Sequence, residues 1–265
     1  MSLEYESVIG KRYKASHLSP LWSTHSKISL MRDLWITLAM YQKEIGVDII
    51  TDEMINEMNE EKNNINLQKI DEYEKRFHHD IMAHIHAFGD LCPKARKIIH
   101  LGATSNFIND NVDLILIQQS LQFILLKEKE LFTKMKDKSF EYKEIPTFAY
   151  THLQQAQLIT IGKRFTMWNQ DLYMDILFLQ ESLQKLAFRG IKGTVGSEDT
   201  LLKLFNGDHS KVILLNEKLS KHYGFEKSLI ICGQTYSRKI DVMIFQVLSN
   251  LCQTIYKIMN DIRNA

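Results

Sequence analysis

A histidine at position 152 stands in the polar segment Thr151-His152-Leu153-Gln154, directly before a long amphipathic stretch. An imidazole in such a place can act as a general acid that protonates a leaving group as its bond breaks. Taken alone, however, the segment is more typical of a surface helix cap that carries an isolated histidine. Whether His152 does chemistry therefore depends on the segments that accompany it.

Four histidines gather at positions 78, 79, 84 and 86. A helical zinc site needs histidines three or four residues apart on one face, and the spacings from His84 are five to His79 and two to His86. The pattern therefore disfavours a metal site. His79 is followed by Asp80, whose carboxylate can fix an imidazole tautomer or raise its pKa. A solvated helix face is the alternative interpretation.

Thr104 and Ser105 follow Gly102 at the expected start of a long helix. Backbone N–H groups at a helix start can bind a carboxylate or a phosphate, although a simple N-cap is the more common arrangement. Two further polar segments contain glycine: residues 192–197 and the stretch around Gln234. Neither has the glycine spacing of an ATP or NAD site.

Long helices are expected to position these segments. Apolar residues recur at steps of three and four in three seams, which is typical of one face of a helix. The first seam is Leu114, Ile117, Leu121, Ile124, Leu131 and Met135, with Glu128 as a polar break; the second is Ile161, Phe165, Trp168, Leu172, Ile176, Leu179, Leu183 and Leu186; the third is Ile240, Met243, Val247, Leu251, Ile255, Ile258 and Ile262. A helix over 105–141 would be roughly 55 Å long and would need partners along its length.

Shorter helices are expected at 27–46, 52–60, 67–90 and 208–222, the second of them starting at Thr51-Asp52-Glu53. Prolines occur only at three positions in the chain, which also favours an all-α fold. The third seam still runs at Ile262, three residues before the last residue. A helix cut mid-course and a terminal helix that frays are equally compatible with that pattern.

Composition narrows the class of protein. The net charge is +1, which gives no reason to expect a nucleic acid or an anionic membrane as the main partner. The cysteines at 92, 232 and 252 suggest neither a disulfide framework nor a metal knuckle. The acidic start at residues 1–6 is unlike a signal peptide, and no apolar run approaches the ~20 residues needed to span a bilayer. These features predict a cytoplasmic protein.

The polar segments occur in an order that resembles the adenylosuccinate lyase family of the fumarase/aspartase superfamily, closest to its animal-type members. The resemblance runs from about Arg12-Tyr13 to Arg263. The blocks that carry it are 79–84, 99–105, Thr151-His152-Leu153-Gln154, Gly162-Lys163-Arg164, 188–194 and 233–239. It implies an N-terminal helical domain over 1–104, followed by a partial long-helix bundle over 105–265.

The resemblance implies a β-elimination that releases fumarate from adenylosuccinate and from the succinyl-carboxamide ribotide of purine synthesis. His152 would be the acid that protonates the departing nitrogen, and His79 a second catalytic residue. The implied substrate contacts are Arg12, Tyr13, His78, Asp80, Thr104, Ser105, Thr151 and Gln234. The family further implies no metal or organic cofactor, and a homotetramer in which three chains build each active site.

Three departures from the family pattern bear on function. His78 replaces an arginine, so a bidentate phosphate contact is lost. Gln155 replaces a proline that would stiffen its loop. The family's Ser-Ser-x-Met-Pro loop, which carries the serine base, does not occur in these residues. Three hypotheses follow: part of a longer lyase, an inactive helical module that associates with full-length lyase subunits, or an unrelated helical scaffold, which the ordered blocks disfavour.

Overall fold

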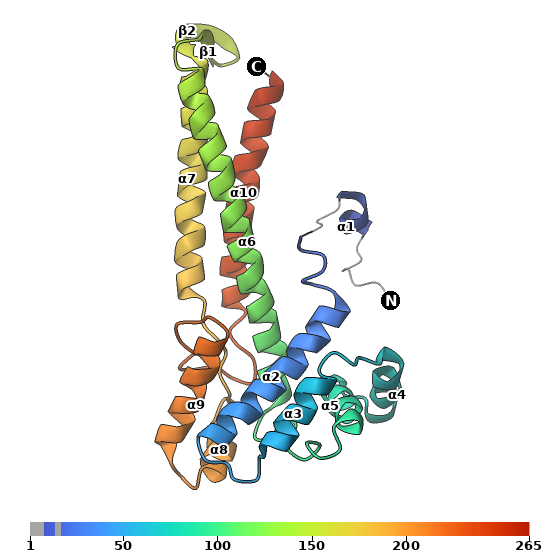
Figure 1. Cartoon of the computed structure of the whole chain (residues 1–265). Coiled ribbons are helices and arrows are strands. Elements are labelled where there is room, and N and C mark those ends of the chain that lie inside the picture. Colours follow the sequence, from blue (N-terminus) through green and yellow to red (C-terminus); the bar gives the residue numbers. More distant parts are fainter. Residues whose placement is uncertain (1–7, 14–16, 265) are drawn as a thin grey trace. The chain divides into compact units, whose positions relative to one another are not determined.

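The computed structural model describes residues 8–13 and 17–264, and helices make up most of it (Figure 1). The all-α class is therefore confirmed, and one short hairpin is added to it. The elements are α1 (Val8–Tyr13), α2 (Thr24–Glu44), α3 (Asp52–Glu61), α4 (Leu67–Phe77), α5 (Asp80–Leu91), α6 (Ser105–Glu141), β1 (Pro146–Thr151), β2 (Gln154–Thr160), α7 (Ile161–Lys185), α8 (Asp199–Leu204), α9 (His209–His222) and α10 (Lys239–Asn264).

Backbone contacts divide the chain into two compact units. The first unit comprises residues 1–117 and 187–237, and the second comprises 118–186 and 238–265. Helix α6 contributes residues to both units, because this division follows contact density rather than helix boundaries. It does not test the domain boundary expected between residues 104 and 105, which stays a prediction.

The first unit is built around α2, whose side chains Leu34, Trp35 and Leu38 are fully buried. Ser23 caps the start of α2 by accepting a hydrogen bond from the N–H of Ser26. Thr51 caps α3 in the same way, so the predicted start signal of this helix is confirmed. The helix predicted at 208–222 is confirmed as α9, which Asp208 caps.

The helix predicted over 67–90 is in fact two helices, so that prediction was wrong. His78 ends α4 in the left-handed conformation, with φ of +50°, and His79 then caps α5 in an extended conformation. A left-handed residue ends a helix, and glycine or asparagine usually fills that place. Because a histidine fills it here, the apolar pattern continued past the break and masked it.

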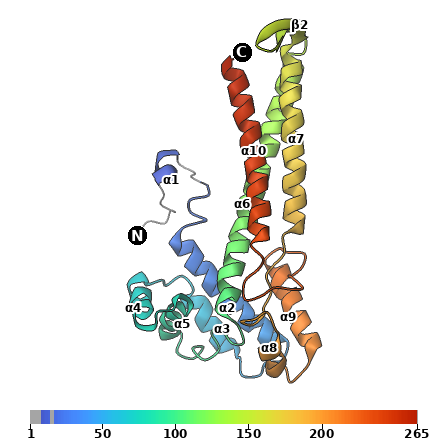
Figure 2. The ribbon, with the colours of Figure 1, turned by 180° about the vertical axis from the view of Figure 1, so that it is seen from behind.

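The second unit packs the later part of α6 against α7 and α10, which run side by side in both views (Figures 1 and 2). Its core includes Met135, Trp168, Leu172, Ile176 and Ile258, all taken from the three predicted seams. Those seams are therefore confirmed. Trp168 Nε1 also donates a hydrogen bond to Asp261 at 2.9 Å, and Lys257 pairs with Asp171 at 2.6 Å.

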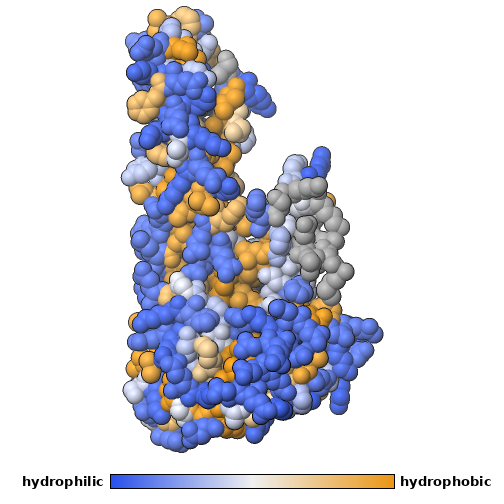
Figure 3. All heavy atoms as spheres, in the orientation of Figure 1, coloured by the Kyte–Doolittle hydropathy of each residue, from blue (hydrophilic) through white to orange (hydrophobic). Residues whose placement is uncertain are grey.

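Apolar side chains also remain exposed on the second unit. Those with large exposed fractions are Met167, Tyr173, Met174, Leu177 and Phe178 on α7, and Phe245, Tyr256, Met259 and Ile262 on α10. Figure 3 shows one face of the molecule, where orange apolar side chains interrupt the blue polar surface along the long helices. Within this chain these helices are thus only partly covered.

A two-stranded antiparallel hairpin joins α6 to α7, where the sequence predicted a helix start. The strands pair from Pro146 with Thr160 to Thr151 with Gln154. Gly162 lets α7 begin directly against the end of α6, since a Cβ there would lie 2.3 Å from the carbonyl oxygen of Ser139. Arg164 donates a hydrogen bond to the carbonyl of Phe148 and so ties β1 to α7.

Candidate active site

His152 lies at the tip of the hairpin, not at a helix start as the sequence suggested. His152 and Leu153 form the two-residue connection between β1 and β2, with φ of +53° and +61°. Such a connection is the type I′ turn, which normally takes asparagine and glycine because both central residues need positive φ. Here a histidine and a leucine adopt positive φ, a conformation that is unfavourable for residues with a Cβ atom. Non-glycine residues held in this region are a recurrent mark of functional sites.

The hairpin presents this turn to solvent. Thr151, His152 and the flanking Gln154 are exposed, and Leu153 is 94% exposed. Gln155, which stands where the family has proline, lies in β2 opposite Tyr150 rather than in a loop that enters a helix. The second unit therefore offers an exposed imidazole on a tight turn that is anchored through β1 by Arg164.

His78, His79 and Asp80 mark the junction of α4 and α5 in the first unit. The Nδ1 atom of His79 accepts a hydrogen bond from the N–H of Met82 at 3.3 Å and lies 3.4 Å from Asp80. Both His79 and Asp80 are more than 40% exposed, so solvent screens this pair. The imidazole thus serves as a helix cap, while its ring stays accessible to a ligand.

The start of α6 connects this junction to the predicted carboxylate-binding residues. Thr104 is buried and directly precedes Ser105, the first residue of α6. One turn later, the amide of Asn109 donates a hydrogen bond to Asp80 at 3.2 Å. Two predicted site segments that lie more than twenty residues apart are thereby brought together.

His100 is a candidate that reasoning from the sequence did not single out. It has positive φ, and its Nδ1 accepts a hydrogen bond from Trp35 Nε1 at 2.9 Å. Burial, assisted by the charge of nearby His79, lowers the pKa of His100 to about 4. The ring is therefore neutral at pH 7. The available signal was its place two residues before Gly102 in the predicted turn.

Gln234 lies on an irregular segment held by buried polar groups. The Arg189 guanidinium donates to the carbonyl oxygen of Gln234 at 2.6 Å through Nη2 and at 3.1 Å through Nε. Asp110 of α6 accepts a hydrogen bond from the N–H of Tyr236 at 2.9 Å and lies 3.6 Å from Nε of Arg189. The start of α6 thus contacts a third predicted site segment.

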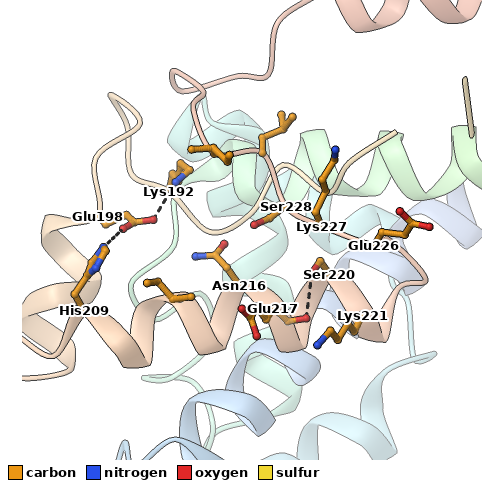
Figure 4. A pocket seen from close by; sticks show the side chains of 13 residues that line it. Lys192, Glu198, His209, Asn216, Glu217, Ser220, Lys221, Glu226, Lys227 and Ser228 are labelled. Carbon is orange, nitrogen blue, oxygen red and sulfur yellow. Dashed lines mark hydrogen bonds and ion pairs between the residues drawn. The ribbon is translucent and has the colours of Figure 1, made fainter. Parts of the chain in front are cut away.

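A pocket of about 550 Å³ lies beside the 192–197 loop (Figure 4). Buried Lys192 pairs with Glu198 at 2.9 Å, and the other oxygen of Glu198 lies 3.1 Å from Nε2 of His209. Further lining residues of both charges include Glu217, Lys221, Glu226 and Lys227. The lining thus includes three lysines and three glutamates.

The remaining predicted site residues lie outside these clusters. Arg12 and Tyr13 lie in the six-residue helix α1, both exposed, with the guanidinium 5.7 Å from the centre of the tyrosine ring. His79, Asp80, Thr104, Ser105 and Gln234 belong to the first unit, whereas Thr151 and His152 belong to the second. Each unit therefore carries its own part of the predicted site.

Residues 8–13 and 17–264 contain neither a candidate metal site nor a candidate membrane-spanning helix. No group of three or more His, Cys, Asp or Glu side chains is placed to hold a metal ion. No helix combines the length and the apolar character needed to cross a membrane.

Known proteins resemble this chain over nearly its whole length. It is 43% identical over 265 residues to the adenylosuccinate lyase of Schistosoma mansoni, and 40% identical over 261 residues to that of Saccharomyces cerevisiae. Each match covers 98% of this chain but 54% of the relative, so the chain spans about half the length of these curated relatives. The predicted family resemblance is confirmed.

The fold agrees with that resemblance. The structure of the 3-carboxy-cis,cis-muconate lactonizing enzyme from Pseudomonas putida superposes with a TM-score of 0.82 at 18% identity, covering 97% of this chain and 57% of the other. At this identity the match speaks for the fold alone. Residues 20–264 match the family described as Lyase, and the chain therefore belongs to the lyase family.

Proposed function

We propose that this chain forms part of an enzyme that eliminates fumarate from adenylosuccinate and from the succinyl-carboxamide ribotide of purine synthesis. The observation that carries the proposal is the 40–43% identity to proteins named adenylosuccinate lyase, combined with the strained turn that presents His152. The reaction is a carbon–nitrogen β-elimination. The activity is the one named for the relatives, whereas the turn is observed in this chain.

In the proposed reaction a base removes a proton from the methylene carbon of the succinyl group. The electron pair forms the carbon–carbon double bond of fumarate, and the bond from the neighbouring carbon to nitrogen breaks. His152 gives its proton to the departing nitrogen, which leaves as the amine of the purine or ribotide product. A well-placed general acid contributes roughly a hundred- to ten-thousandfold in rate.

The other candidate residues would hold the substrate. Thr104 and Ser105 would bind a succinyl carboxylate, and Thr151 would contact the substrate beside His152. His79, with Asp80 and His78, would serve the phosphate and catalytic end, with His79 the second catalytic residue. The remaining proposed contacts are Arg12, Tyr13 and Gln234. Because His78 stands where the family has an arginine, the bidentate contact that a guanidinium makes with phosphate would be lost.

The proposed partner is a second copy of a lyase subunit, in a homotetramer of the cytoplasm. Each active site would combine segments of three subunits, with a serine base from a loop outside these 265 residues. The exposed apolar side chains of α7 and α10 support a contact between subunits, because large apolar patches rarely remain open to water. No organic cofactor or metal enters the proposed reaction.

An assay with two components tests the proposal. The purified chain is mixed with the S. cerevisiae adenylosuccinate lyase in which the residue aligned with His152 is replaced by alanine, and fumarate release from adenylosuccinate is followed. The proposal predicts turnover by the mixture and loss of that turnover when the chain carries His152→Ala. Mixed oligomers that form, as native mass spectrometry would detect, but release no fumarate would contradict it and would favour an inactive helical module.

A further inference from the structure

Arg189 is an unusual residue to find fully buried beside an irregular segment. Its guanidinium has five N–H donors, and its contacts are to main-chain carbonyl oxygens and a carboxylate. Besides Gln234, it donates to the carbonyls of Gly233 at 3.4 Å, and of Gly190 and Lys192 at 3.1 Å each. A single side chain thereby joins the turn at 190–192 to the segment at 233–234.

Helix α6 fixes both ends of this arrangement. Asn111 Oδ1 accepts a hydrogen bond from the N–H of Arg189 at 2.8 Å, so the main chain of Arg189 is held as well as its side chain. Asp110 lies 3.6 Å from Nε and also accepts the N–H of Tyr236. The segment around Gln234 is thus held on both sides, through its own carbonyl and through the amide two residues later.

Stability alone does not account for a charged group at this place. Replacing a buried ion pair by apolar residues of similar volume is often neutral or stabilising. What a guanidinium adds is a planar fork of donors that orders carbonyl groups lacking helix or strand partners. Residues 232–238 contain neither helix nor strand, and the side chain of Gln234 is exposed at their centre.

We propose that Arg189, together with Asp110, is a positioning residue that sets the place of Gln234 for substrate binding. This inference rests on the proposed function, in which Gln234 contacts the substrate. Arg189 itself is fully buried and is not proposed to touch the substrate. Through Lys192, whose carbonyl it also holds, the same guanidinium fixes the start of the loop that carries the Lys192–Glu198 pair (Figure 4).

The chain provides a matched control in the same unit. Arg32 is 2% exposed, and its guanidinium donates to the carbonyls of Glu61, Lys62 and Asn64 at 2.8–3.1 Å. None of these three residues belongs to a predicted site segment. Arg189→Lys and Arg32→Lys each keep the positive charge but remove the planar set of guanidinium N–H donors. A merely structural role predicts equal consequences for the two variants.

The test compares the two variants by amide hydrogen exchange and in the mixed-lyase assay. Arg189→Lys is expected to raise exchange across 232–238 and to raise KM for adenylosuccinate roughly ten- to hundredfold, with a smaller change in kcat. Arg32→Lys is expected to leave both unchanged. In a chain that carries Gln234→Ala, Arg189→Lys should raise KM by less than about twofold, because its effect acts through Gln234.

Unchanged exchange in Arg189→Lys, or additive effects of the Arg189 and Gln234 substitutions, would overturn the inference. If Arg189→Lys fails to fold, Asp110→Asn provides the same comparison with a smaller change. If the unmodified mixture shows no turnover, the proposed function fails first, and exchange at 232–238 then decides alone whether Arg189 orders this segment. The two failures are therefore distinguishable.

Discussion

The two compact units differ in how they satisfy their buried polar groups. Among the side-chain nitrogen and oxygen atoms in the described part of the first unit, only Oε1 of Gln42 is buried without a hydrogen-bond partner. In the second unit both carboxylate oxygens of Glu128, Oδ1 of Asn169 and Oδ2 of Asp175 have no such partner. The first unit uses buried charge to order irregular segments, whereas the second places two carboxyl groups among apolar helix faces.

This difference predicts how each unit responds to charge. A satisfied buried charge is costly to remove, while an unsatisfied one is costly to keep. Burial, together with the nearby carboxylate of Asp175, raises the pKa of Glu128 to about 7. Burial also raises the pKa of Asp175, and a hydrogen bond from the Thr254 hydroxyl partly offsets that rise. The two units are therefore expected to show opposite responses to substitution and to pH.

The largest expected effect is the loss of a satisfied charge in the first unit. Asp110→Ala should destabilise this unit by roughly 3–5 kcal/mol, because it leaves the buried guanidinium of Arg189 without its carboxylate. Urea unfolding followed by ¹⁹F NMR of fluorotryptophan measures the units separately, since Trp35 lies in the first and Trp168 in the second. A loss of less than about 1 kcal/mol at Trp35 would contradict the predicted difference between the two units.

The opposite sign is expected in the second unit. Glu128→Leu should stabilise the Trp168 transition by about 1–3 kcal/mol at pH 8, because it removes a buried carboxyl group that has no partner. Glu130→Leu is the control on an exposed face of the same helix. Destabilisation by Glu128→Leu would mean that this carboxyl group is satisfied.

The pH dependence of the second unit follows from the raised pKa of Glu128. The folded unit holds a proton on Glu128 up to about pH 7, whereas the unfolded chain releases it near its ordinary pKa of 4.5. The contribution of Glu128 to the stability of the folded unit is therefore complete below pH 4.5. It is lost as the pH rises to 7, by up to about 1.4 kcal/mol for each pH unit. Glu128→Gln should abolish this slope at the Trp168 signal.

His100 should give the first unit the reverse slope. Its pKa is lowered from 6.5 to about 4, so the folded unit disfavours the charged imidazole. The contribution of His100 to stability is complete above pH 6.5. It is lost as the pH falls to 4, again by up to about 1.4 kcal/mol for each pH unit. The Trp35 signal reports it, and His100→Gln should flatten the curve. Parallel slopes at Trp35 and Trp168 would refute the contrast between the units.

The smallest expected effect concerns the turn that carries His152. Leu153→Gly should stabilise the hairpin by about 1 kcal/mol, because φ of +61° is strained for leucine and almost no packing is lost. Leu158→Gly, in strand β2, is the control and should weaken the hairpin instead. Amide exchange of Ala149 and Gln157 measures both. Weaker protection in Leu153→Gly would mean that the turn is not strained.

Sequence periodicity predicted the long helices well, because apolar residues recur along one face of each helix. The helix expected over 105–141 has those bounds, and the second and third seams gave α7 and α10. The hairpin was missed because His152 and Leu153 occupy places where a turn of this type normally shows asparagine and glycine. The break at His78 was missed for the same reason.

The sequence predicted which segments contribute to the candidate site, but not the hydrogen bonds and ion pairs that connect those segments. The order of the blocks indicated His79, Thr104 and Gln234, yet nothing in the sequence shows that Arg189 and Asp110 are buried together. Long-range contacts such as Asn109 with Asp80 depend on how the helices pack. Patterns along the chain report which face is apolar, whereas pairing between buried polar groups is decided in three dimensions.

The most direct measurement of the central claim is fumarate release by the mixture of this chain with the acid-deficient S. cerevisiae lyase. The unmodified chain is expected to restore turnover, and His152→Ala is expected to lower it by roughly a hundred- to ten-thousandfold while mixed oligomers still form. Equal turnover with the two chains would contradict the assignment of His152 as the acid.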